Sequence, residues 1–314
     1  MMRFCVPVCL FSALLCPIGT VAQTVEDTSH AFTFRYENDF FNATDQYFTQ
    51  GVQVAYQAPF IGKSPLAYVL LRLKDTPQQH ALLLEQQCYT PTSIRRDTIF
   101  TGERPFAAAL FIAQRRVTAD PARGLRLTSL LSLGVLGPCA VCAEEQRGIH
   151  EALDNIEPLG WEFQIASDAI VNYGAQLEKR IIGLPFAEAA LGVSGDVGTY
   201  RTNAGLVASL ELGRFVSRFV TSKPFDGKFR VSAFGEGQVK LVGYDATLQG
   251  GLFNDGSPYT LQADDVERTV LTGGFGVKAS YRRFSLTALR TFITREFRTG
   301  RDHGWGGFLL EYRW

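Results

Sequence analysis

Charged residues are scarce in this chain, and their signs cancel. Of the 314 residues only 20% are Asp, Glu, Lys or Arg, with 31 basic against 31 acidic side chains. A formal net charge of zero argues against general electrostatic binding to nucleic acid, so no nucleic-acid partner is expected. Hydrophobic residues make up 46%, including 24 Phe and 11 Tyr, which excludes a disordered chain. The open question is where so much apolar and aromatic surface lies.

Long apolar runs are missing everywhere except at the N-terminus. There, Arg3 precedes an apolar stretch at residues 4–15, and small residues lead up to Ala22. This order is typical of a secretory signal peptide, and we expect residues 1–22 to be removed by cleavage after Ala22. A buried N-terminal helix is the alternative, but the segment holds two prolines, and no acidic residue precedes Glu26. Since no later run approaches the ~18 apolar residues of a membrane helix, we expect an exported protein that is not a helical membrane protein.

Helical periodicity is also scarce, whereas strict alternation of apolar and polar residues is common. Phe32, Phe34 and Tyr36 alternate with polar neighbours, and the same pattern recurs along the chain to its last residues. Such alternation is typical of strands with one apolar face, either in a soluble β-sandwich or in a transmembrane barrel whose apolar face meets lipid. Twelve candidate strands begin near residues 30, 48, 78, 104, 125, 169, 186, 205, 228, 268, 283 and 305.

The end of the chain distinguishes these two folds. Phe308, Leu310 and Tyr312 alternate toward a terminal Trp314. A soluble sandwich has no evident use for an aromatic residue that ends an alternating strand, whereas bacterial outer-membrane barrels commonly end in this way. We therefore predict an all-β fold, a single transmembrane antiparallel β-barrel of about 12 strands over residues 23–314 in the bacterial outer membrane. The barrel-assembly machinery is the expected partner of the strand that ends in Trp314.

An even strand count also predicts which loops share one end of the barrel. If both termini are periplasmic, the outer loops span about residues 38–47, 88–103, 137–168, 200–204, 242–267 and 294–304. Three of the opposite links are short, at residues 119–124, 183–185 and 282–283. Long outer loops and short periplasmic turns are typical of such barrels. Residues 143–153 break the strand pattern and predict a short helix inside the third outer loop.

Oxygen-bearing residues gather in and beside the first of these loops. Asp39, Asn38 and Thr49 supply a carboxylate, an amide and a hydroxyl, which suit a hard cation such as Ca²⁺. An Asn- and Asp-rich hairpin loop without a metal is the plainer alternative. If Phe34 and Tyr36 face lipid and the strands stay regular, parity directs Asp39 and Thr49 into the barrel.

Two further pairs of residues are candidates for catalysis or for substrate binding. Gln146 and His150 lie four positions apart, so they share one face of the predicted loop helix, and histidine is the usual general base near neutral pH. Arg95 and Arg96 are suited to bidentate phosphate binding, with a solvated rim of arginines as the alternative. The sequence contains no Gly-x-Ser-x-Gly elbow and no zinc-type cluster of Cys and His.

Six cysteines are present, and three of them, Cys88, Cys139 and Cys142, follow the predicted signal peptide. A local disulfide between Cys139 and Cys142 is one interpretation, and two free thiols are the other. Cys88 stays unpaired if the local disulfide forms, and no cysteine is assigned a catalytic role.

Several of these segments, taken in order, resemble the outer-membrane lipid A 3′-O-deacylase family. The matching segments are Glu37–Phe41, Tyr47–Gly51, Gly102–Phe106, Gly134–Pro138, Gln146 with His150, Gly160–Gln164 and Glu296–Gly300. They extend across essentially the whole mature chain. The chain departs from the family at Glu103, where an Asp is expected. Glu157 is the nearest acid before the Gly-Trp pair, and no tyrosine accompanies it.

The resemblance implies a twelve-stranded barrel and a calcium-dependent esterase that removes the 3′-linked acyloxyacyl chain of lipid A. The implied site residues are Asn38, Asp39, Thr49, Gln146 and His150, the first three also near the metal. It further implies that Ca²⁺ stabilises the oxyanion, that His150 activates water, and that Arg95 and Arg96 hold the glucosamine phosphate. Lipopolysaccharide of the outer leaflet is then the substrate. A barrel phospholipase and a passive pore or adhesin are the alternatives.

Overall fold

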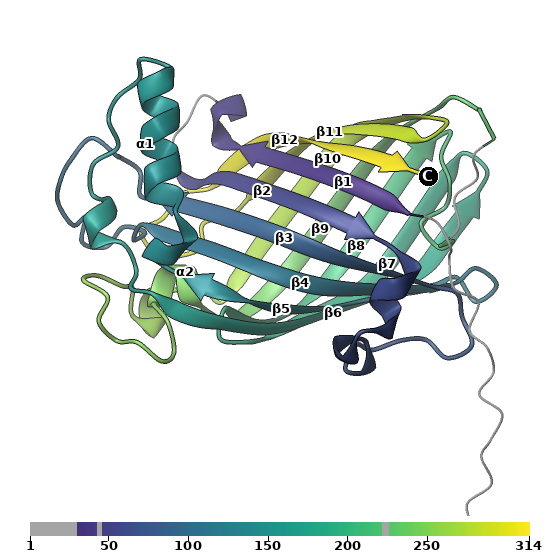
Figure 1. Cartoon of the computed structure of the whole chain (residues 1–314), viewed down its shortest axis with the longest axis horizontal. Helices are drawn as coiled ribbons and strands as arrows, with labels where there is room; N and C mark the ends of the chain where they lie inside the picture. The colour runs from purple at the N-terminus through teal and green to yellow at the C-terminus, as the bar shows by residue number, and fades with distance from the viewer. Residues whose placement is uncertain (1–29, 43–45, 222–225) are drawn as a thin grey trace, which may run out of the picture.

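The computed structural model describes residues 30–42, 46–221 and 226–314, so the predicted signal peptide, residues 1–22, lies outside the described residues. In this part of the chain, twelve antiparallel strands close into one barrel and each pairs with its sequence neighbours (Figure 1). This confirms the predicted fold and strand count. The strands are β1 (Ala31–Asn38), β2 (Tyr47–Gln57), β3 (Gln78–Thr90), β4 (Ala107–Asp120), β5 (Leu125–Leu136), β6 (Asp168–Leu184), β7 (Ala187–Gly198), β8 (Arg201–Gly213), β9 (Arg230–Asp245), β10 (Thr269–Tyr281), β11 (Phe284–Ile293) and β12 (His303–Arg313).

Closure of the barrel depends on the two ends of the chain. β1 pairs with β12 over its whole length, from Ala31 to Asn38. Beyond β1, the backbone N–H of His30 donates to the carbonyl of Trp314 at 3.1 Å, and the N–H of Trp314 donates back at 3.0 Å. Because each strand then has a partner on both sides, closure removes the open sheet edges that a lipid environment does not tolerate.

The polarity of the two barrel faces explains why these strands form a membrane barrel. Large apolar side chains on the outward face are exposed, among them Leu84 (48%), Ile112 (59%) and Leu206 (64%). Inward-facing positions carry ion pairs, such as Arg126 with Glu178 at 2.7 Å. An apolar outer face suits lipid and a polar interior suits water, which is the reverse of a soluble sandwich.

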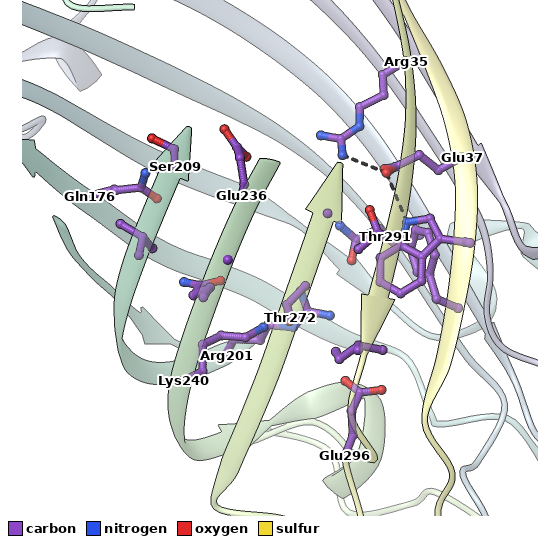
Figure 2. A pocket seen from close by; sticks show the side chains of 18 of the residues that line it. Arg35, Glu37, Gln176, Arg201, Ser209, Glu236, Lys240, Thr272, Thr291 and Glu296 are labelled. Atoms are coloured by element: carbon purple, nitrogen blue, oxygen red, sulfur yellow. Dashed lines mark hydrogen bonds and ion pairs between the residues drawn. The ribbon is translucent and has the colours of Figure 1, made fainter. Parts of the chain in front are cut away.

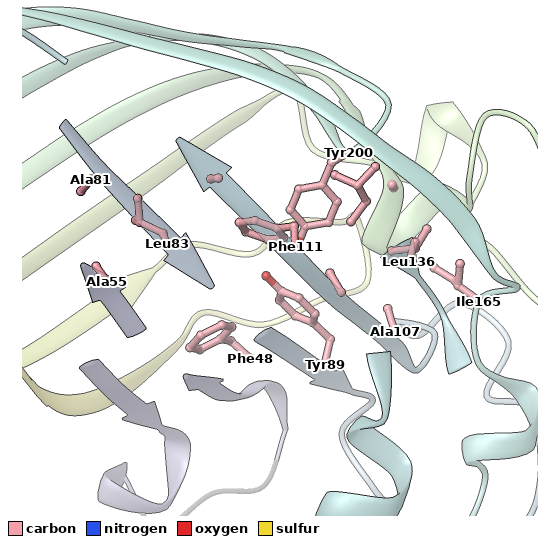
Figure 3. Close-up of a cluster of buried hydrophobic side chains, with 14 residues drawn as sticks. Phe48, Ala55, Ala81, Leu83, Tyr89, Ala107, Phe111, Leu136, Ile165 and Tyr200 are labelled. Carbon is pink, nitrogen blue, oxygen red and sulfur yellow. The ribbon is translucent and has the colours of Figure 1, made fainter. Parts of the chain in front are cut away.

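Aromatic side chains pack inside the barrel (Figure 3). Phe48, Tyr89, Phe111 and Tyr200 belong to one buried cluster. The ring centroids of Phe48 and Tyr89 lie 5.5 Å apart, and those of Phe111 and Tyr200 lie 5.8 Å apart. The lumen also holds a cavity of about 380 Å³ that is lined by charged residues of both signs (Figure 2). The interior is therefore partly filled by side chains.

The two ends of the barrel differ. One end, here called the helix end, carries α1 (Cys142–Ala152) and α2 (Ala246–Gln249), while the chain terminates at the other (Figure 1). α1 confirms the helix predicted at residues 143–153, with each boundary shifted by one residue. Among the described residues, no helix combines the length and apolar character needed to cross a membrane. The 3-10 helices are η1 (Asp39–Asn42), η2 (Pro59–Lys63), η3 (Pro65–Tyr68), η4 (Pro138–Ala140), η5 (Trp161–Phe163) and η6 (Ala263–Asp265).

The links between strands show the expected difference in length, with exceptions. The longest links, residues 137–167 and 246–268, lie at the helix end, and the two-residue turns 185–186 and 282–283 lie at the opposite end. The link of residues 199–200, at the helix end, is equally short. Residues 58–77, which include η2 and η3, form a longer link at that opposite end. The assignment of the helix end to the cell exterior remains a prediction from loop length and chain termini.

Candidate active site

A cavity of about 220 Å³ lies at the helix end between α1 and the outer wall of the barrel. Tyr36, Gln50 and Cys88 contribute its wall. In the strand register, Tyr36 pairs with Val52, and Gln50 pairs with Cys88. Since Gln50 lies two positions before Val52, all three wall residues continue the outward-facing rows of their strands. The cavity is therefore on the lipid-facing side of the barrel and not in the lumen.

Five of the residues singled out in the sequence line this one cavity. They are Asn38, Asp39, Thr49, Gln146 and His150. The first three come from β1, η1 and β2, whereas the other two come from α1. Folding therefore brings the candidate metal ligands and the candidate base together from distant parts of the chain, although the role of each residue remains a prediction.

The prediction that Asp39 and Thr49 point into the barrel is wrong. β1 ends at Asn38 and Asp39 begins η1, so the alternation of the strand does not extend to this carboxylate. At Thr49 the pairing of β2 with β3 shifts between Phe48 and Gln50. A bulge adds one residue to a strand. Phe48 consequently packs in the lumen, while Thr49 lines the outer cavity beside Gln50.

Asp39 is the most deeply buried acid of the cavity, with 2% of its surface exposed. Its Oδ2 accepts a hydrogen bond from the backbone N–H of Gln46 at 2.6 Å. Its Oδ1 accepts one from the hydroxyl of Thr49 at 3.5 Å. The side-chain oxygen of Asn38 accepts from the backbone N–H of Phe40 at 2.7 Å, which fixes the first turn of η1. These contacts join Thr49 to Asp39 and fix the orientation of Asn38, which lines the same cavity.

This donor set decides which metal the site suits. Asp39, Asn38 and Thr49 offer only oxygen atoms, which hard cations such as Ca²⁺ prefer. No group of three or more His, Cys, Asp and Glu with the arrangement of a metal site occurs among the described residues. A cation here would therefore depend on neutral oxygens as well as on Asp39. The residues fit a loosely built calcium site better than a zinc site.

α1 presents Gln146 and His150 to the cavity from one face. His150 is buried, and its Nδ1 lies 2.5 Å from the carbonyl oxygen of Ile156. Because a carbonyl oxygen only accepts, Nδ1 carries the proton and the neutral ring has its lone pair on Nε2. The side-chain oxygen of Gln146 accepts a hydrogen bond from the indole N–H of Trp161 at 2.7 Å. Residues that follow the helix thus hold both side chains in fixed orientations.

Trp161 supports the site through Gln146, and no role for it was predicted from the sequence. It is buried, and its ring centroid lies 4.9 Å from that of Phe106. Gly160 has a φ of +93°, and a Cβ at this position would lie 2.9 Å from the Phe106 ring. Only glycine accommodates both the backbone angle and the close approach. The Gly160-Trp161 pair therefore places the indole against Gln146.

The cavity has an apolar rim, which the sequence analysis also missed. Phe40 is 77% exposed and Leu153 is 70% exposed, and both line the cavity together with Phe41 and Ile149. Ile149 and Leu153 lie three and seven positions after Gln146, so they share its helical face. That spacing is the sequence signal that could have identified them.

Cys88 of β3 and Cys142 of α1 form a disulfide across a sequence separation of 54. The two interpretations of a local Cys139–Cys142 bond and of free thiols at both positions are therefore wrong, as is an unpaired Cys88. Cys139 is the free cysteine of the described chain and is exposed. Spacing could not reveal the correct pair, because the outward row of β3 meets α1 only when β3, β4 and β5 are paired.

Arg95 and Arg96 do not line the cavity. Both are exposed and belong to the link of residues 91–106. That link is joined to the segment after α1, where the N–H of Leu159 donates to the carbonyl of Ile94 at 2.7 Å. The arginine pair is thus at the helix end on a neighbouring loop, and its binding of phosphate remains a prediction.

Two other matching segments contribute to a buried network on the lumen side. The fully buried guanidinium of Arg104 donates to Glu296 and to the hydroxyl of Thr247, each at 2.6 Å, and Thr247 donates to Asp245 at 2.6 Å. Burial opposes ionisation of Glu296, but the nearby positive groups, with Arg104 contributing most, together outweigh it, so the pKa of the carboxyl is lowered from its ordinary value. This network connects the loops over the lumen and does not line the outer cavity.

Comparisons with known proteins agree with the barrel. A family model described as "Outer membrane protein LpxR" matches residues 6–314. No curated protein sequence matches the chain. The solved structure of LpxR from Salmonella typhimurium is similar with a TM-score of 0.72 and 20% identity, covering 91% of this chain and 99% of that chain. A KdgM porin (TM-score 0.41, 7% identity, 90% and 98% covered) and the β domain of the Bordetella autotransporter BrkA (0.43, 12%, 91% and 97%) are more distant.

Proposed function

Because the chain belongs to the LpxR family of outer-membrane proteins, we propose that it is a lipid A 3′-O-deacylase. In this proposal it hydrolyses the ester that joins the 3′ acyloxyacyl chain to lipid A, the lipid anchor of lipopolysaccharide in the outer leaflet. One observation carries the proposal. The candidate metal ligands and the candidate base line a single cavity on the lipid-facing wall. A site in this position meets a membrane lipid without requiring the lipid to leave the bilayer.

The apolar rim supports a lipid substrate. Phe40 and Phe41 from η1 and Ile149 and Leu153 from α1 border the polar cavity. An acyl chain that lies between these side chains would stay in apolar contact while its ester reaches the polar residues. A cavity in the lumen, lined by charged residues, would not offer this environment.

His150 acts as the general base in the proposed mechanism. Its Nδ1–H is held by Ile156, so Nε2 takes a proton from water, and the water oxygen attacks the ester carbonyl carbon. The bond between the acyl carbon and the sugar oxygen then breaks, and the imidazolium returns its proton to the sugar oxygen. The products are the acyloxyacyl chain, released as a carboxylic acid, and a sugar hydroxyl. Gln146, held by Trp161, orients the attacking water, and no serine acyl-enzyme is required.

Asp39, Asn38 and Thr49 are the residues that would hold a calcium ion. Asp39 would supply the charge, and its hydrogen bonds to Gln46 and Thr49 keep the carboxylate in place. A bound Ca²⁺ supplies a Lewis acid that polarises an ester carbonyl and stabilises the oxyanion. Since one carboxylate gives limited affinity, the ion is expected to exchange readily with a chelator.

Head-group recognition and assembly complete the proposal. Arg95 and Arg96 would hold the glucosamine phosphate from the neighbouring loop, because a guanidinium pairs well with phosphate oxygens. The barrel-assembly machinery would recognise the strand that ends in Trp314. Because the arginine pair does not line the cavity, a phospholipase is the second candidate, since its substrates share the ester and the acyl chain.

The experiment that tests the function uses purified protein in detergent with Ca²⁺. Lipid A and a glycerophospholipid are offered separately, and the products are identified by mass spectrometry. We expect lipid A to lose its 3′ acyloxyacyl group while the phospholipid stays intact. Hydrolysis of the phospholipid alone would favour the second candidate, and hydrolysis of neither lipid would contradict an esterase.

A further inference from the structure

We propose that the Cys88–Cys142 disulfide is a positioning element of the active site. It fixes α1 against the barrel wall at the separation from which His150 reaches the ester. The inference rests on the deacylase activity proposed above. It concerns how the base is placed, and it assigns no chemical step to either sulfur atom.

The disulfide shares the helical face of the proposed catalytic pair. Cys142, Gln146 and His150 follow one another at intervals of four, so they form one stripe along α1. Both cysteines also line the cavity and are almost fully buried, with 4% of Cys88 and 1% of Cys142 exposed. The sulfur bridge is therefore a point at which α1 meets β3, and it lies inside the site.

α1 needs support from the rest of the molecule. It has only 11 residues, and a helix of this length is marginally stable in water by itself. Val141 precedes its first turn with a φ of +57° and makes no side-chain cap. At the other end, Leu153 is largely exposed. The first turn, which begins with Cys142, packs against the barrel wall in a buried apolar cluster that includes Cys88 and Ala108.

The other links between this region and its surroundings are apolar packing and single hydrogen bonds. Cys142 and Ala143 belong to a buried cluster with Ala108 and Trp161, and Trp161 donates to Gln146. Gln50 donates to Glu145 at 2.6 Å, and Gln86 donates to the carbonyl of Ala140, just before the helix, at 2.8 Å. Water or a lipid head group can replace such bonds at a membrane edge. The disulfide is the one covalent link between α1 and the wall in the described chain. Without it, α1 would remain attached but would shift relative to β3.

Such a shift affects catalysis more than substrate binding. Phe40 and Phe41, which belong to η1, still contact the acyl chain when α1 moves. Ile149 and Leu153 move with α1, but a small shift keeps them at the apolar rim, and apolar contact is not directional. The distance from His150 to the ester changes directly, and a displacement of about 1 Å costs roughly 10²-fold in rate. Loss of the bridge is therefore expected to lower kcat by about 10²-fold and to leave KM within about twofold.

The experiment compares three proteins that share the substitution Cys139→Ser, which removes the third thiol. The parent keeps the disulfide. The second carries Cys88→Ser with Cys142→Ser, and the third carries Cys88→Val with Cys142→Ala, which keeps the wall apolar without a covalent link. Each is assayed for kcat and KM on lipid A, for hydrogen exchange of the amides at residues 143–152, and for heat-modifiable gel mobility as a check on the barrel.

We expect both bridge-free proteins to keep the mobility of a folded barrel, to exchange the amides of α1 faster, and to lose kcat with KM little changed. Parental kcat in either one would overturn the inference, and parental kcat in the Val/Ala protein would mean that packing alone positions α1. If the parent itself does not hydrolyse lipid A, the proposed function fails. The hydrogen-exchange rates then still test whether the disulfide holds α1 in place, because equal exchange of the α1 amides in all three proteins would overturn the inference.

Discussion

Replacement of His150 is the sharpest test of the mechanism, because the structure separates its two roles. The ring donates from Nδ1 to the carbonyl of Ile156 and has its lone pair on Nε2. His150→Ala removes both functions and leaves a carbonyl without this partner, at a local cost of about 1–3 kcal/mol. His150→Gln keeps an amide donor for Ile156 but has no base. If Nε2 is the base, both variants lose activity.

The magnitude follows from general-base catalysis. Removal of a positioned base lowers the rate by about 10²–10⁴-fold, which corresponds to about 3–5 kcal/mol of transition-state stabilisation. The assay is kcat on purified lipid A in detergent with saturating Ca²⁺, with heat-modifiable mobility as the control for barrel assembly. Activity of His150→Gln within tenfold of the parent would refute the base assignment, because only the hydrogen bond to Ile156 would then matter.

Three further outcomes are expected. EGTA should abolish hydrolysis and added Ca²⁺ should restore it, whereas Mg²⁺ should restore it poorly. Asp39→Ala should be inactive at every Ca²⁺ concentration. Unchanged activity after exhaustive chelation would contradict the metal proposal. On intact cells, a protease or label should reach residues 137–167 but not residues 121–124, and the opposite result would reverse the orientation of the barrel. Glu296→Gln removes the charged partner of the buried Arg104 and should lower the free energy of unfolding by about 3–5 kcal/mol in a denaturant titration, whereas an unchanged midpoint would argue against this network.

Strands and the loop helix were predictable from local pattern. The alternation of apolar and polar side chains is imposed by the strand itself, since successive side chains point to opposite faces. The twelve predicted starts therefore agree with the observed strands to within a few residues. The helix at residues 143–153 was equally local, because a stretch that breaks the period of two is visible without knowledge of its neighbours.

The direction of individual side chains was less predictable. Parity failed at Asp39 because β1 stops one residue earlier, and it failed at Thr49 because a bulge inserts a residue into β2. A bulge and a strand end depend on how neighbouring strands pair, and a period of two contains no record of either. As a result, the side chains of Asp39 and Thr49 line a cavity on the lipid-facing wall instead of pointing into the barrel.

The amino-acid pattern alone thus dictates that this chain forms strands with one lipid-compatible face, and its ordered motifs indicate the family. The place of the site depends on contacts between distant segments. Cys88 reaches Cys142 only when the pairing of β3, β4 and β5 places β3 beside the link of residues 137–167, and Trp161 reaches Gln146 only when that link folds back on α1. Arg95 and Arg96 stay off the cavity for the same reason, because loop packing and not spacing sets their position. Periodicity is set within each segment, whereas the geometry of a site depends on contacts between segments that only the tertiary structure brings together.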